Sequence, residues 1–365
     1  MPTGRICLFA ALISVSATTC RADFKYTTSS QVTGGTLVGM TKTLGVFSKN
    51  ARQITTPQTS TTMVKGNRLR DEHPDGTVSI IDLDGRRFIN VDTVNKRYST
   101  MTFDEFKAAM QRAKERAKEE QAQQEAKHPE AANYKVVPKM QTQETGATRT
   151  ILNLPTKEVK WQLDMEMQST DPNAQANAQG QTPSTRMTSD SWIAESVPGY
   201  DELHDFYVKA AKELDWLPGT MSSTLGMNSQ SKEAMEEFRK NSLKLKGMAL
   251  LTYTSMGMAV SGPQAGQAGA AQQQQQAPQD NSIPTNPKDA ISKSIGGLFG
   301  KKKKQDQPTA DANTPTPPSN PGSLMDMQIE VKSYSNDPLD KSLFEVPAGY
   351  TQVPANADNP LIMQH

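Results

Sequence analysis

The chain has 365 residues, of which only 35% are hydrophobic, and it contains 23 glycines and 23 prolines. This composition excludes a protein whose whole length is packed core, and it predicts one domain interrupted by long insertions. Because 40 basic residues balance 39 acidic ones, the net charge of +1 creates no overall field for nucleic acid or an acidic substrate, and no nucleic-acid partner is expected.

The first 22 residues have the layout of a secretory signal peptide. Arg5 is the positive residue of the start, the apolar run ICLFAALISVSA follows, and Cys20 and Ala22 are small residues at the positions that a signal peptidase recognises. Cleavage after Ala22 predicts export across the inner membrane, with the periplasm as the expected location. Lipidation of Cys20 is the alternative, although the residues before it differ from the usual lipoprotein signal. Cleavage would remove both cysteines, Cys7 and Cys20, and with them any cysteine chemistry.

The stretch from Gly66 to Met101 predicts an antiparallel meander. Its short apolar runs are separated by the turn pairs Asp75-Gly76 and Asp84-Gly85, which are expected to supply the left-handed conformations of tight hairpins. Four apolar residues share faces at a period of two, namely Val78 with Ile80 and Ile89 with Val91. Ahead of the meander, the segment TLVGMTKTLGVF is the best candidate for a first strand.

A first helix is expected to begin at the capping box TFDE. There the Thr102 hydroxyl can accept a hydrogen bond from the amide of Glu105, while the Glu105 carboxylate reaches back. The helix has a narrow apolar stripe of Phe103, Phe106 and Met110, followed by a long charged run. We therefore expect its second half to project into water.

A second helix is predicted from Tyr200 to Leu214, and it is expected to cover one face of the sheet. Its apolar residues recur at helical spacing and are Leu203, Phe206, Tyr207, Ala210 and Leu214. The pair Pro218-Gly219 follows it as a stop signal. A shorter helix is expected around SKEAMEEFRKNS, residues 231–242.

Further strand patterns run from Tyr134 to Gln168 and through the segments RMTSDSWIAES, GMALLTYTSMGMAV and LMDMQIEVKSYS. Low-complexity segments at about 171–184 and 261–323 predict disordered insertions. Since the last strand cannot form a domain alone, the second insertion is expected to join two paired strands. The chain would then divide into the signal peptide, one domain over 23–354 and a tail over 355–365.

The second insertion contains the segment AISKSIGGLFGKKKK. Its apolar and basic residues could contact an anionic membrane surface or a partner. These residues are Ile295, Leu298, Phe299 and Lys301 to Lys304. A solubilising, disordered linker is the alternative.

Four segments, in this order, resemble a known family: KGNRLRDEHPDGTVSIIDLDGRRFINVDTVNKRYSTM, SDSWIAESVPGYDELHDFY, KGMALLTYTSMGMA and DPLDKSLFEVPAGYTQV. They are similar to secreted bacterial proteins of a family of unknown function that is akin to the periplasmic outer-membrane lipoprotein carriers. The resemblance implies an α+β fold, in which a strongly curved antiparallel sheet forms a half-open barrel with helices on its concave side. In the carriers, that concave side holds acyl chains.

Methionine is the most informative residue type, with 18 copies. At a period of two, three strands each place apolar residues on one face. Nine of these residues are candidate ligand-binding residues: Trp161, Leu163, Met165, Met167, Met256, Met258, Met325, Met327 and Ile329. Because methionine is flexible and polarizable, such a face could adapt to a hydrophobic ligand, but it could equally be packed core beneath the helices. The Met-x-Met pairs would also suit Cu(I), but no cysteine or clustered histidine supports a metal site.

No nucleophile elbow, phosphate-binding glycine loop or zinc-ligand spacing is present in the sequence, and the four histidines are scattered. We therefore expect no enzyme activity, no catalytic residues, no metal and no cofactor. The sequence favours a monomeric, non-catalytic envelope protein that binds a hydrophobic or acyl-chain ligand. A structural or protein-interaction module, with an envelope protein as its partner, is the alternative.

Overall fold

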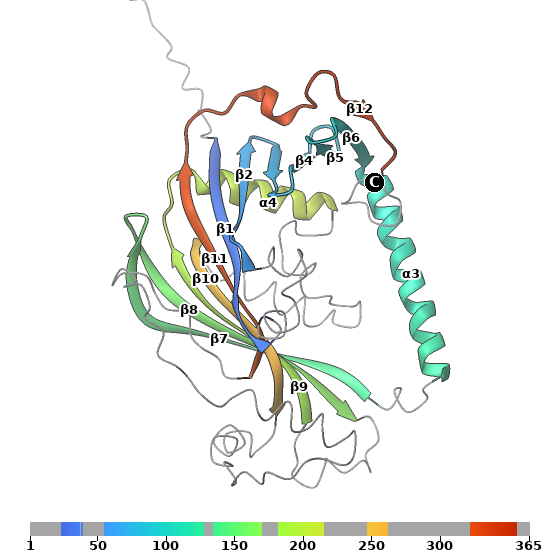
Figure 1. Ribbon diagram of the computed structural model, residues 1–365, viewed down its shortest axis with the longest axis vertical. Coiled ribbons are helices and arrows are strands. Elements are labelled where there is room, and N and C mark those ends of the chain that lie inside the picture. Colours follow the sequence, from blue (N-terminus) through green and yellow to red (C-terminus); the bar gives the residue numbers. More distant parts are fainter. Residues whose placement is uncertain are drawn as a thin grey trace, which may run out of the picture.

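The computed structural model describes residues 23–36, 38, 55–127, 134–169, 182–214, 247–261 and 322–355. Within these residues the chain forms one open sheet of twelve strands, two α-helices and a short 3-10 helix (Figure 1). Every neighbouring pair of strands is antiparallel except β12 with β6. The expectation of an antiparallel sheet with helices is therefore confirmed. No helix in this part of the chain is long and apolar enough to cross a membrane.

The elements have the following bounds. The strands are β1 (Phe24–Gly34), β2 (Gln58–Lys65), β3 (Arg68–Glu72), β4 (Thr77–Asp82), β5 (Arg87–Asp92), β6 (Arg97–Thr102), β7 (Tyr134–Ile151), β8 (Leu154–Ser169), β9 (Thr182–Ala194), β10 (Met248–Ser261), β11 (Ser323–Ser335) and β12 (Thr351–Gln352). The helices are α3 (Phe103–Lys127), α4 (Tyr200–Leu214) and the 3-10 helix η4 (Lys341–Phe344).

Two meanders share the sheet. Strands β1 to β6 lie side by side in chain order, and so do β7 to β11. The meanders join where β1 pairs with β11, with Tyr26 opposite Tyr334 and Thr28 opposite Val331 (Figure 1). The first and last long strands of the domain are therefore central, while β7 and β12 form the two edges.

The strands that flank the second predicted insertion are neighbours, as expected, with Met256 opposite Met325. Residues 262–321 lie outside the described part of the chain. The predicted end of the first insertion is wrong, because Thr182 to Ser184 belong to β9 and pair with β10 up to Ser261. Backbone pairing with a long neighbour needs no apolar side chains, so the polar composition of these residues did not reveal the strand.

The N-terminal meander carries one apolar row that crosses six strands. Each member is the cross-strand partner of the next, and all are buried: Phe24, Val64, Leu69, Ile81, Phe88 and Met101. The predicted stripe of α4 packs into the same core cluster through four buried side chains, Leu203, Phe206, Ala210 and Leu214, with Tyr207 partly buried beside them. The amphipathic pattern of α4 therefore located this contact correctly.

The capping box of α3 is confirmed. The amide of Glu105 donates to Thr102 Oγ1 over 3.2 Å, and the amide of Thr102 donates to Glu105 Oε2 over 2.7 Å. The Phe103 and Phe106 rings each lie 5.0 Å from the Phe88 ring, so the first turns of α3 belong to the core. Beyond Ala109 the described side chains of α3 are exposed except for the half-buried Ala113, as expected of a helix half that projects into water (Figure 1).

The predicted apolar stripe of α3 is wrong at one position. Met110 is 38% exposed, whereas Ala109 is buried. The stripe follows i, i+3 spacing from Phe103 through Phe106 to Ala109, because only this narrow strip of the helix faces the core.

The opposite face of β4 and β5 is also buried. Val78, Ile80, Ile89 and Val91 form a second cluster, as their period-two spacing predicted. The chain after β11 covers this cluster with Val346 and Tyr350, and Arg70 Nη1 donates to the Leu343 carbonyl over 2.7 Å. The segment DPLDKSLFEVPAGYTQV therefore serves as a cover for the sheet.

Two local predictions near the meander need correction. Gly76 has the expected left-handed φ of 83°, but at the second turn Arg86 rather than Gly85 is left-handed, with φ 48°. The Gly85 amide donates to Asp82 Oδ1 over 3.0 Å, which shifts the turn by one residue. The first strand, β1, precedes the segment TLVGMTKTLGVF, and most of that segment lies outside the described residues.

Substitution of Phe206 tests the packing of α4. The side chain is 0% exposed, so Phe206→Ala should lower the free energy of unfolding by about 3–5 kcal/mol. Chemical denaturation would measure the loss. Val208→Ala on the same helix is the matched control, because Val208 is 36% exposed and should change stability by less than about 0.5 kcal/mol. Equal losses in the two variants would contradict the packing of α4.

Candidate functional site

The C-terminal meander carries a second row that crosses five strands. Each member is the cross-strand partner of the next: Met140, Leu163, Met187, Met256 and Met325, on β7, β8, β9, β10 and β11 respectively. Because cross-strand partners project to the same side of a sheet, these five side chains share one face. We call this set the methionine row.

The other predicted ligand-binding residues flank the methionine row on the same face. On one side of it, Trp161, Met327 and Ile329 are the partners of Ser189, Thr254 and Thr252. On the other side, Met165 and Met258 are both partners of Thr185. Met167 continues the pattern of β8 opposite Val136, but its side chain is outside the described part of the chain.

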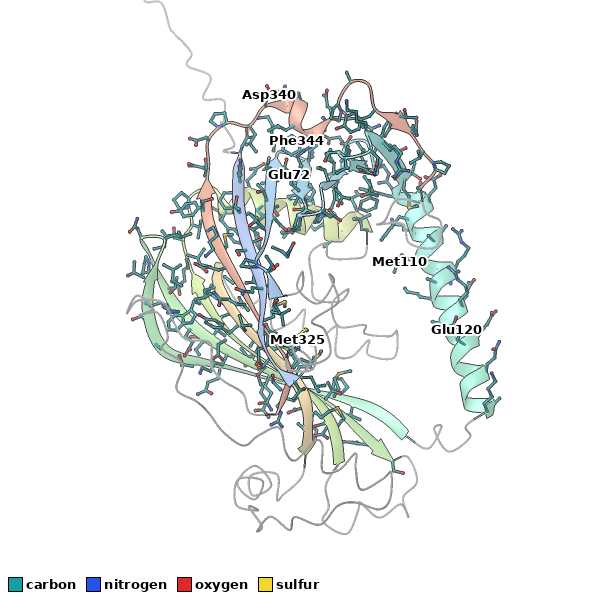
Figure 2. The ribbon with its side chains drawn as sticks, in the orientation of Figure 1. Glu72, Met110, Glu120, Met325, Asp340 and Phe344 are labelled. Atoms are coloured by element: carbon teal, nitrogen blue, oxygen red, sulfur yellow. The ribbon has the colours of Figure 1, made fainter. Side chains whose placement is uncertain are left out.

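Burial divides these residues. Trp161, Leu163 and Met187 are buried and form a cluster against which Met140, Met165 and Met256 pack. Met258 is 66% exposed, so it does not belong to the cluster. This cluster is separate from the core under α4 and α3, and Figure 2 places Met325 low on the sheet, away from Phe344 and Glu72 at its upper end.

Two members of the methionine row, Met140 and Met187, were not among the predicted ligand-binding residues. The immediate neighbours of both are polar: Lys139 and Gln141 flank Met140, and Arg186 and Thr188 flank Met187. A lone methionine gives no periodic signal. Only the register with β8 and β10 shows that these two side chains complete the row.

The opposite face of the same strands is charged. Arg186 Nε lies 2.6 Å from Asp164 Oδ1, and Lys139 Nζ lies 2.7 Å from Glu166 Oε2. Lys160 adds an ion pair with Asp190, with 3.4 Å between Nζ and Oδ2. The strands β7 to β9 are therefore strongly two-sided, with ion pairs on one face and methionines on the other.

Four hydroxyl side chains interrupt the apolar face next to the methionine row. Ser189 Oγ lies 3.3 Å from Ser191 Oγ, which lies 3.4 Å from Thr252 Oγ1. Thr254 is the fourth, and its Oγ1 is buried without a hydrogen-bond partner. We call these four residues, Ser189, Ser191, Thr252 and Thr254, the hydroxyl cluster.

A different polar cluster lies beside α4, on the next row of the N-terminal meander. Tyr26, Thr62 and Asp71 are successive cross-strand partners, and Thr62 Oγ1 donates to Asp71 Oδ1 over 2.6 Å. Burial raises the pKa of Tyr26 to about 12 and raises the pKa of Tyr207 on α4 well above its ordinary value. Burial also raises the pKa of Asp71, against the opposing effect of the Thr62 hydrogen bond.

Among the described residues, no group of three or more His, Cys, Asp and Glu side chains is placed to hold a metal ion. His204 is exposed on α4, with Nδ1 4.0 Å from Asp205 Oδ1, as a solvated helix face would have it. The predicted membrane-contact residues, Ile295 to Lys304, lie outside the described part of the chain.

None of the protein-family models, curated proteins or solved structures compared with the chain matches it. The comparisons therefore identify no family. The resemblance to lipoprotein carriers stays a prediction from the four sequence segments.

The pKa of Asp71 generates a prediction about pH. A carboxyl group whose pKa is raised on folding binds more protons in the folded state, so its contribution to stability is lost as pH rises above the ordinary value of 3.8. Asn at this position does not ionise. Asp71→Asn should therefore gain stability relative to the wild type as pH is raised from about 3 to about 7. Urea denaturation at several pH values would measure this trend.

Asp75→Asn is the matched control with the opposite sign. The Thr77 hydroxyl donates to Asp75 Oδ1 over 2.7 Å and the Thr77 amide over 2.9 Å, and these bonds lower the pKa of Asp75. Its contribution to stability is present at neutral pH and lost as pH falls through the lowered pKa. The Asn variant should lose stability relative to the wild type as pH rises. Parallel trends in the two variants would contradict the assignment for Asp71.

Proposed function

We propose that the chain is a non-catalytic, secreted envelope protein that binds a hydrophobic or lipid-like ligand on the face containing the methionine row. In this proposal the sheet is a half-open barrel, the long strands curve around the ligand, and the helices lie on the concave side. The bending of β7 to β11 in Figure 1 supports such a shape. The resemblance of the sequence to periplasmic lipoprotein carriers agrees with it.

The methionine row is the observation that carries the proposal. Five strands each contribute one large, apolar side chain to a single line, and four of the five are methionine. Branched side chains have few rotamers and therefore hold a packed core in one arrangement. The flexible methionine side chain can instead change its conformation to fit apolar surfaces of different shape. A line of methionines along a sheet is therefore suited to an extended apolar chain.

The two-sided character of the strands supports the same proposal. The ion pairs of Asp164, Glu166 and Asp190 occupy the other face of β7 to β9, so on these three strands the methionine face is the one suited to an apolar ligand. The face also changes from buried at Leu163 to 66% exposed at Met258. Such a gradient gives a ligand both a dry interior and an entrance.

A structural or protein-interaction module is the second candidate. Trp161, Leu163 and Met187 are each only 7–8% exposed, which is the burial expected of a closed core. In that case the methionines pack against protein and bind nothing else. The two candidates differ in whether the face accepts an added molecule.

A Met-to-Trp substitution in the row distinguishes them. Wild-type protein should bind the neutral apolar dye N-phenyl-1-naphthylamine saturably, and fatty acids, phospholipids or lipopeptides should displace it. Met256→Trp should reduce dye affinity at least about tenfold, because the larger ring fills the proposed space. Fluorescence titration measures the affinity, and circular dichroism checks that the fold is retained.

Val94→Trp is the control, because this side chain is 73% exposed in the turn between β5 and β6, outside the methionine row, and the substitution should leave dye affinity unchanged. Met256→Leu should cost less than about 1.5 kcal/mol of stability under either candidate. Absence of saturable dye binding by the wild type, together with a loss of stability of about 1–3 kcal/mol in Met256→Trp, would favour the structural module.

A further inference from the structure

The four residues of the hydroxyl cluster are cross-strand neighbours on the methionine face. Thr252 is the cross-strand partner of Ser191, and Thr254 is the partner of Ser189. Thr254 is also the partner of Met327 on β11, and Ser189 is the partner of Trp161 on β8. The hydroxyl cluster is therefore a polar patch directly beside the methionine row, and apolar side chains surround it.

Thr254 differs from the other three. Ser189, Ser191 and Thr252 are within 3.4 Å of one another in a chain of contacts, so each has a hydroxyl neighbour. Thr254 is only 7% exposed, and its Oγ1 has no hydrogen-bond partner. Buried hydroxyls nearly always have a partner, and one that lacks it destabilises the fold. A free donor at this point therefore needs a reason.

We propose that Thr254 donates a hydrogen bond to an uncharged oxygen of the ligand, such as the carbonyl of an ester, while the attached chain lies along the methionine row. The inference rests on the proposed function and specifies the ligand's polar end. Thr254 and Met256 are two residues apart on β10 and their side chains lie on the same face. One ligand molecule could therefore contact both. The other three hydroxyls extend the polar patch toward Ile329.

Among the described residues, the two cross-strand rows that contain these hydroxyls have no positively charged side chain, which favours a neutral polar end in the ligand. The two rows that contain the hydroxyls carry Trp161, Val159, Met327 and Ile329 beside them. The charged member of these rows is Glu144, which is exposed on the edge strand β7 and is acidic. A carboxylate or phosphate here would lose its water without gaining a counter-charge, which is strongly unfavourable.

Competition against N-phenyl-1-naphthylamine tests the inference. The competitors are methyl decanoate, undecane of similar length and decanoate at neutral pH. Wild-type protein should bind methyl decanoate about tenfold more tightly than undecane, the factor expected of one hydrogen bond, and decanoate should be the weakest of the three. Thr254→Val, which keeps the side-chain shape, should abolish the preference for the ester and leave undecane affinity unchanged. Thr188→Val on the opposite face is the control and should change neither.

A second measurement needs no ligand. If Thr254 Oγ1 is unpaired in the free protein, Thr254→Val should raise the melting temperature, whereas a fall would mean that bound water satisfies the hydroxyl and would overturn the inference. Equal affinities of wild-type protein for the ester and the alkane would also overturn it, while dye binding would still support the proposed function. Failure of the dye to bind would refute the proposed function itself, and the inference with it.

Discussion

The pairing of β1 with β11 is the constraint on which the rest of the structure depends. It joins a meander built from the first part of the domain to one built from the last part, through partners such as Thr28 and Val331. Without it, the row under α4 and the methionine row would belong to two separate sheets. With it, Met327 has Val32 of β1 as its partner, so the methionine face continues into the N-terminal meander. Pairing strands that are so far apart in the sequence costs conformational entropy when the chain folds. This entropic cost rises only slowly with each further residue in the intervening segment.

The single sheet has a banded surface along its strands. Under α4, the row from Phe24 to Met101 is fully apolar, and the next row, with Tyr26 and Asp71, is polar. On the C-terminal strands, the methionine row lies directly next to the hydroxyl cluster along the strand direction. A ligand on this face would therefore meet polar and apolar bands in a fixed order, and an amphiphilic molecule would have one preferred direction.

Features that depend on neighbouring residues could be predicted from the sequence. The capping box at Thr102, the stripe of α4 and the shared faces of Val78 with Ile80 follow from local spacing, and the structure has all three. Features that depend on register could not be predicted. Met187 has polar neighbours in sequence, and only its partners on β8 and β10 make it central. The same holds for the unpaired hydroxyl of Thr254, because a sequence does not show which buried donors lack acceptors.

The edge position of β7 affects how the protein behaves beside other copies of itself. An open sheet exposes backbone donors and acceptors at its edges, and a long, regular edge strand can recruit strands from other chains. Strand β7 has 18 residues, but Pro138 removes a donor from it, and its pairing with β8 shifts register between Glu144 and Thr148. Both features interrupt the edge. Such interruptions make the edge of the twelve-stranded open sheet a poorer template for pairing with strands of other chains.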